Sequence, residues 1–186
     1  MEKFKKDVSV VQSEEFMNMV SSFFSGNSLF GKGEHKDKNV DDGTVRGLIL
    51  SGHYYFIGEH VYKGDGIGSN GKIIATASRR RLKPEDIIMI TSDTDEIDSR
   101  NFTGLAFTET QLFVFSHGSI DYIIDYAEME NIDFDGSDVY ITVTEGETVC
   151  IDCEAMASDS DEDQVESYAE ESYNLLMDIK ERVENA

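Results

Sequence analysis

The chain has 186 residues, 39% of them hydrophobic and 29% charged, which suits one globular domain or one domain with an appended subdomain. Its charge is divided unequally: residues 1–92 carry 13 Lys/Arg and 12 Asp/Glu, whereas residues 93–186 carry 3 Lys/Arg and 26 Asp/Glu, giving a net charge of −22. An acidic half this strong repels nucleic acid and anionic membranes and attracts basic partners, so we expect neither direct nucleic-acid binding nor membrane association.

The sequence also predicts a cytoplasmic protein. The lysines at positions 3, 5 and 6 are not followed by the apolar stretch of a secretory signal, and no run of apolar residues is long enough to span a membrane. Cys150 and Cys153 are too few for a disulfide scaffold, as expected in a reducing cytosol.

The first 81 residues predict a helical region with glycine-rich loops. Ser9 and Gln12 have capping-box spacing, and apolar residues recur at helical spacing from Val11 to Phe24, so a helix is expected there, with a surface for homo-oligomerisation. Residues 25–44 have the composition of a loop.

The stretch 45–62 fits either two short strands or one helix interrupted by glycines. We favour the helix, because six residues approximate one stripe: Val45, Leu48, Gly52, Tyr55, Phe56 and Val61. A glycine-rich loop at 64–71 follows, and residues 73–81 predict a short helix that Pro84 closes.

From residue 82 onward the pattern changes to strands, and connections of roughly two to ten residues indicate an antiparallel meander. Seven strands are expected: Ile87–Ile90, Phe102–Phe107, Leu112–Phe115, Ile120–Tyr126, Ile132–Phe134, Val139–Thr144 and Val149–Ile151. A final helix is expected to be capped by Asp159 or Ser160, with an apolar stripe that includes Val165, Ala169, Leu176 and Ile179.

The local sequence of this second half resembles bacterial pleckstrin-homology-like (PH-like) domains over residues 82–184. The resemblance is carried by Leu82–Asp86, by Gly104-Leu105-Ala106-Phe107-Thr108 followed by Leu112-Phe113-Val114, and by Ile123–Met129. It implies an α+β fold, in which a bent, partly open seven-stranded antiparallel sheet is capped by a C-terminal helix. The domain would occupy residues 82–186, preceded by the irregular helical region 1–81.

The resemblance also implies a binding scaffold without enzymatic activity or a cofactor. Phosphoinositide-binding relatives use Lys and Arg in the loop between their first two strands. Here that loop, Thr91–Asn101, has Asp93, Asp95, Glu96 and Asp98 against Arg100 alone, so lipid binding is not carried over.

The first functional hypothesis is therefore a module that docks a basic protein through its acidic surface. The candidate partner-binding residues are Asp93, Asp95, Glu96, Asp98, Asp121, Asp125, Asp133, Asp135 and Asp138. The alternative is an acidic inhibitor of a nucleic-acid enzyme, of the phage counter-defence or toxin-immunity type, that presents carboxylates where phosphates would lie.

A third hypothesis is nucleotide binding through Gly66–Lys72, which matches both GxGxxG and GxxxxGK. Ile73 stands where a P-loop needs Ser or Thr for magnesium, so we favour a plain glycine-rich connection.

Three other motifs have plain structural interpretations, which we favour. Cys150 and Cys153 have zinc spacing without a second ligand pair, and on a strand they point to opposite faces. The run Asp159-x-Asp161-x-Asp163 resembles a calcium loop without its glycine. The four histidines do not cluster in the sequence.

Arg79, Arg80, Arg81 and Lys83 form the one concentrated basic run. It is interpreted either as a helix C-terminus whose charge the helix dipole neutralises, or as a run that pairs internally with the acidic half, or as a contact for an anion.

Overall fold

The computed structural model describes residues 41–52, 58–157 and 162–186. All of them belong to one compact unit, Lys38–Ala186, which begins earlier than the boundary predicted between residues 81 and 82. The helix predicted between Val11 and Phe24, with its surface for self-association, lies outside the described residues.

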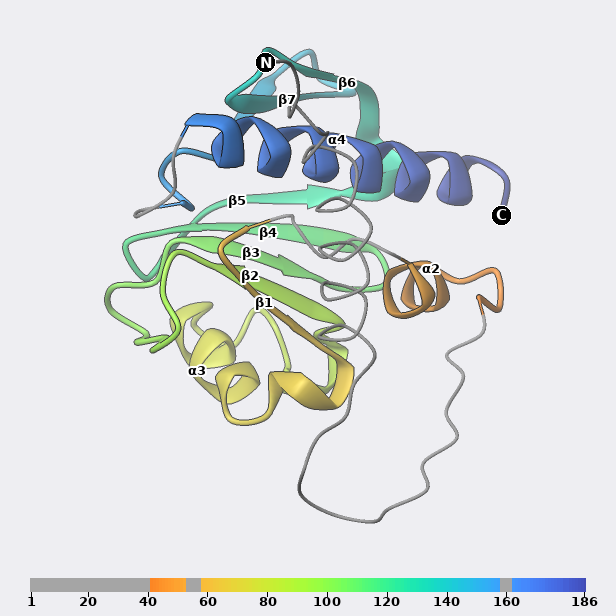
Figure 1. Ribbon diagram of the computed structural model, residues 1–186. Helices are drawn as coiled ribbons and strands as arrows, with labels where there is room; N and C mark the ends of the chain where they lie inside the picture. The colour runs from red at the N-terminus through yellow and green to blue at the C-terminus, as the bar shows by residue number, and fades with distance from the viewer. Residues whose placement is uncertain (1–40, 53–57, 158–161) are drawn as a thin grey trace, which may run out of the picture. The chain divides into compact units, whose positions relative to one another are not determined.

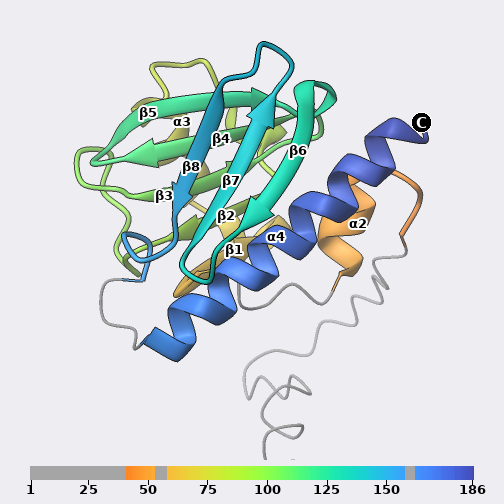
Figure 2. The ribbon, with the colours of Figure 1, turned by 90° about the horizontal axis from the view of Figure 1, so that it is seen from above.

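The described chain is an α+β fold with two antiparallel sheets (Figures 1 and 2). The first sheet has five strands in chain order, β1 (His60–Lys63), β2 (Met89–Ser92), β3 (Gly104–Phe107), β4 (Gln111–Ser116) and β5 (Ser119–Asp125). The second has three, β6 (Met129–Phe134), β7 (Asp138–Val143) and β8 (Thr148–Asp152). The antiparallel meander is confirmed, but it is divided between two sheets that do not close.

An eighth strand, β1, forms within the stretch that was predicted as one helix. Helix α2 (Val45–Ser51) confirms the first part of that prediction, but the expectation of helix is wrong for His60–Tyr62. These residues pair with β2, His60 opposite Ser92 and Lys63 opposite Met89. Because the partner lies about thirty residues later in the chain, local periodicity does not reveal this pairing.

Helix α3 (Asn70–Ala77) is displaced from its predicted bounds of 73–81. It ends early because Ser78 donates its hydroxyl to the Ala75 carbonyl at 2.7 Å and accepts the Leu82 amide at 3.1 Å. The chain then turns through Arg79 and Arg80, which adopt left-handed φ angles of 53° and 64°.

Helix α4 (Glu162–Glu184) packs against β6, β7 and α2. Its predicted stripe is confirmed at Val165, Ala169, Leu176 and Ile179, and Ser172 and Leu175 are buried beside it. The main core lies between this stripe, α2 and the two sheets. Of the described helices, none is both long and apolar enough to cross a membrane.

A second apolar cluster lies between α3 and the five-stranded sheet. It contains Ile74 of α3 with Ile90, Phe102, Phe113 and Phe115. The five-stranded sheet is thus covered on both faces, which explains why every residue of β2 and β3 is buried.

The start of β3 gives a stability prediction. A Cβ at Gly104 would lie 2.0 Å from the Thr91 carbonyl oxygen of the paired strand, and a backbone atom cannot rotate away. Gly104→Ala should lower the free energy of unfolding by about 1–3 kcal/mol, measured by urea denaturation. Gly66→Ala, where a Cβ meets nothing within 4 Å, is the matched control and should stay within about 0.5 kcal/mol. Equal effects of the two substitutions would contradict the assigned register.

Candidate functional site

Several acidic connections meet at one end of the molecule. In an antiparallel meander, alternate connections lie at the same end, so the β2–β3 loop meets the β4–β5 turn. The Gly118 amide of that turn donates to the Phe102 carbonyl at 2.8 Å. The β6–β7 turn, the end of β8 and the start of α4 lie on this side as well, at the left of Figure 1.

We call this region the acidic end and define it by its carboxylates: Asp93, Asp95, Glu96, Asp98, Asp133, Asp135, Asp138, Asp152, Glu154, Glu162 and Glu166. Its carboxylates line two hollows. The first, of about 360 Å³, is bordered by Glu59, His60 and the β2–β3 loop; the second, of about 620 Å³, lies between the β6–β7 turn and α4.

In the first hollow, some carboxylates hold the loop in shape and others do not. Asp93 accepts the Thr103 amide at 3.2 Å, and Asp98 accepts the Arg100 amide at 3.1 Å. Asp95 and Glu96 are exposed and form no side-chain hydrogen bond with another described residue. The loop therefore holds these two carboxylates at the surface, and its own hydrogen bonds do not involve them.

In the second hollow, Asp135 organises the turn. It accepts the Tyr140 hydroxyl at 2.9 Å and the Asp138 amide at 3.2 Å. The hydrogen bond from Tyr140 is the main cause that lowers the pKa of Asp135, and its counterpart raises the pKa of Tyr140 to about 12. Glu154, Glu162 and Glu166 complete the rim.

The carboxylates around Asp138 repel one another. Burial raises the pKa of its carboxyl, and the nearby charges of Asp152 and Asp135 raise it further. Like charges are thus held together by the fold, a state in which an incoming cation relieves electrostatic repulsion.

Of the nine candidate residues predicted from the sequence, eight lie at or beside the acidic end: seven belong to its definition, and Asp121 follows the β4–β5 turn. Asp121 is exposed near the start of the edge strand β5, and Asp133 is exposed on β6. Asp125 is at the other end of β5, where it accepts the Ala127 amide at 3.1 Å and caps a short 3₁₀ turn. The structure does not bring Asp125 together with the others.

Four carboxylates at these hollows were missed from the sequence: Glu59, Glu154, Glu162 and Glu166. They belong to chain segments whose meeting depends on the pairing of distant strands. Within the described ranges, no group of three or more His, Cys, Asp or Glu side chains is arranged to hold a metal ion. Asp159 and Asp161 of the calcium-like run, with His35 and His53, lie outside those ranges.

The Gly66–Lys72 loop joins the edge strand β1 to α3 through a 3₁₀ turn, Gly64–Ile67. A P-loop instead follows a buried strand of a parallel sheet directly. Lys72 is exposed on the first turn of α3. The geometry therefore favours the plain connection over a phosphate cradle.

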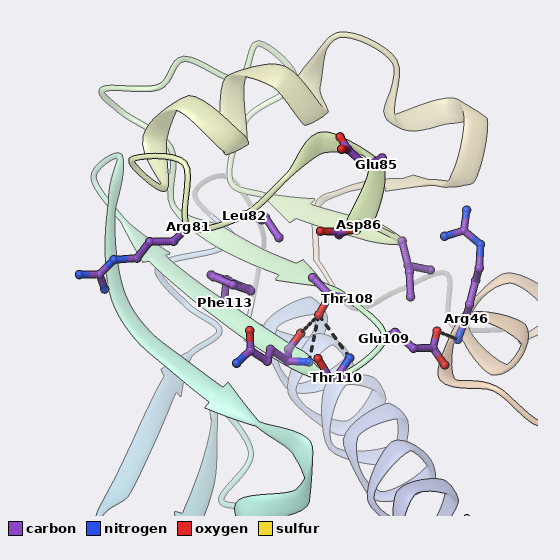
Figure 3. A pocket seen from close by; sticks show the side chains of 11 residues that line it. Arg46, Arg81, Leu82, Glu85, Asp86, Thr108, Glu109, Thr110 and Phe113 are labelled. Atoms are coloured by element: carbon purple, nitrogen blue, oxygen red, sulfur yellow. Dashed lines mark hydrogen bonds between the residues drawn. The ribbon is translucent and has the colours of Figure 1, made fainter.

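A third hollow, of about 310 Å³, is shown in Figure 3. Arg46 and Arg81 stand on its two sides, with Glu85 and Asp86 between them and the buried Leu82 and Phe113 beneath. Its charges are mixed, unlike those at the acidic end.

Glu109, at the rim of this third hollow, has a structural role. Its two carboxylate oxygens accept the Val45 amide at 2.9 Å and the Arg46 amide at 3.0 Å, so the side chain caps the first turn of α2 (Figure 3). Because both oxygens are engaged, we do not assign Glu109 to ligand binding.

Comparison of the chain with protein-family models, with curated proteins and with solved structures gives no match. The chemistry of the described residues is therefore the basis of the functional proposal.

The burial of the two cysteines leads to a prediction about the reactivity of their thiols. Both are free thiols: Cys150 is exposed, and Cys153 is fully buried just after β8. Burial raises the pKa of Cys153 to about 12 and also raises the pKa of Cys150.

With iodoacetamide at about pH 8, Cys150 should be alkylated slowly and Cys153 only after unfolding. Mass spectrometry of the native and urea-unfolded protein measures this, with Cys150→Ser as the control. Native alkylation of both thiols at one rate would contradict the assignment.

Proposed function

We propose that the protein is a non-enzymatic binding module whose acidic end docks a basic protein. The observation that carries this proposal is that the β2–β3 loop, the β6–β7 turn, the end of β8 and the start of α4, all rich in Asp and Glu, lie at one end of the fold (Figure 1). Arg100 is the one Lys/Arg residue between positions 93 and 153. Such a surface attracts a basic partner over long distances and makes association fast and salt-dependent.

We further propose that residues 82–184 form a PH-like domain. The order of elements supports this: four strands, β2 to β5, then three strands, β6 to β8, then the C-terminal helix α4. Strand β1 adds to the free edge of β2 and lies outside the resemblance. We place the binding in the cytosol, in keeping with two free thiols.

A more specific version of this function is inhibition of a nucleic-acid enzyme. One observation favours it: Asp93 and Asp135 are held by hydrogen bonds to the backbone, so their negative charges stand in fixed positions, as phosphates do along a nucleic acid. The partner would then be a nuclease or a related enzyme, and a polynucleotide would compete with this protein for it.

Two paired charge removals test the docking surface. Asp95→Asn with Glu96→Gln removes two charges at the acidic end without breaking a hydrogen bond of the described fold. Glu145→Gln with Glu147→Gln removes two exposed charges at the opposite end of β7 and is the matched control.

The partner is first recovered by affinity capture on the unmodified chain at low salt and identified by mass spectrometry. We expect the variant at the acidic end to lose about threefold to tenfold in affinity for it, and the control less than twofold. Binding should also weaken steeply from about 0.05 to about 0.5 M salt. Equal losses in both variants, or a partner retained unchanged at high salt, would count against the proposal.

A further inference from the structure

The turn after α3 carries a concentration of positive charge that contrasts with the rest of the chain. Five of the 16 Lys/Arg residues lie within positions 72–83. These residues, Lys72, Arg79, Arg80, Arg81 and Lys83, are all exposed. The ion pairs of the described residues involve other groups, so the expected internal pairing of this run with the acidic half is not seen among them.

The backbone of this turn is strained at two arginines. Arg79 and Arg80 have φ angles of 53° and 64°, a region that glycine or asparagine occupies at lower cost. The Arg79 amide donates to the Thr76 carbonyl at 3.0 Å, and the Arg80 amide donates to the Ala75 carbonyl at 3.1 Å. The turn is therefore fixed by hydrogen bonds, and it has arginine at two positions where glycine or asparagine would be less strained.

A shallow hollow of about 340 Å³ lies beside this turn. Three apolar residues line it: Pro84 is exposed, whereas Ala75 and Leu82 are largely buried beneath it. Three cations, Lys72, Arg80 and Lys83, border it together with Thr76 and one acid, Glu85. An apolar centre with cations around it is complementary to an apolar side chain flanked by carboxylates.

We propose that this cationic hollow binds an acidic segment of a partner protein. An apolar side chain of the segment sits on the exposed Pro84, above the buried Leu82, and its neighbouring carboxylates pair with Lys72, Arg80 and Lys83. A short acidic segment fits better than a nucleic acid, because the net charge of −22 repels a long polyanion along its whole length. This second surface is independent of the acidic end and selects the opposite charge.

The test measures the fluorescence anisotropy of a short labelled peptide of Asp, Glu and Ser with one central Leu, titrated with the full chain. Two altered peptides separate the parts of the proposal: in one, Ser replaces Leu, and in the other, Asn and Gln replace the acids. Each change should weaken binding at least about fivefold. An unlabelled DNA oligonucleotide of similar length should compete poorly.

Lys72→Gln with Lys83→Gln tests the site and leaves the strained backbone untouched. This variant should lose at least about fivefold in peptide affinity. Arg46→Gln with Arg100→Gln removes two exposed cations elsewhere and should change it less than twofold. Arg80→Lys, which keeps the charge, should retain most of the affinity.

Four outcomes would overturn the proposal: no binding of the acidic peptide, equal binding of the peptide without Leu, equal losses in the two double variants, or tighter binding of the oligonucleotide. The last would identify the turn as a nucleic-acid contact. None of them bears on the acidic end, whose test uses a basic partner and different substitutions.

Discussion

Helix α4 packs its apolar stripe onto two sheets that do not close, and Leu175, Leu176 and Ile179 are fully buried there. Burying one such side chain contributes about 1.5–3 kcal/mol, whereas the helix alone carries eight acidic and two basic residues and repels itself. The helix therefore depends on the sheets, and the sheets depend on the helix to cover their shared core.

This packing also decides where the charge lies. Strands β2 and β3 are buried on both faces and contain no charged residue, because an unpaired buried carboxylate costs more than the strand can offset. The Asp and Glu residues therefore lie in the connections, on the edge strands and on the outer face of α4. Since alternate connections of a meander share an end, acids that lie far apart in the sequence come together at the acidic end.

Local patterns predicted much of this fold, because alternation and turn residues act between near neighbours. The seven strands from residue 87 to 151 and the stripe of α4 follow from such patterns. Strand β1 does not, since its formation depends on the backbone of β2 about thirty residues away. The same restriction to near neighbours explains which site residues could be predicted. Asp95 and Asp135 were predicted because they lie in acidic loops. Glu59, Glu154 and Glu162 were missed, because they reach the two hollows only when the strands and the helix assemble.

Two surfaces of opposite charge thus stand on one scaffold, the acidic end and the cationic hollow beside α3. The central claim concerns the first of them, and hydrogen–deuterium exchange of the full chain tests it most directly, with and without the partner retained at low salt. Docking at the acidic end predicts that the partner slows exchange in the β2–β3 loop, the β6–β7 turn and the first turn of α4. Protection confined to other segments, or none at all, would contradict the claim.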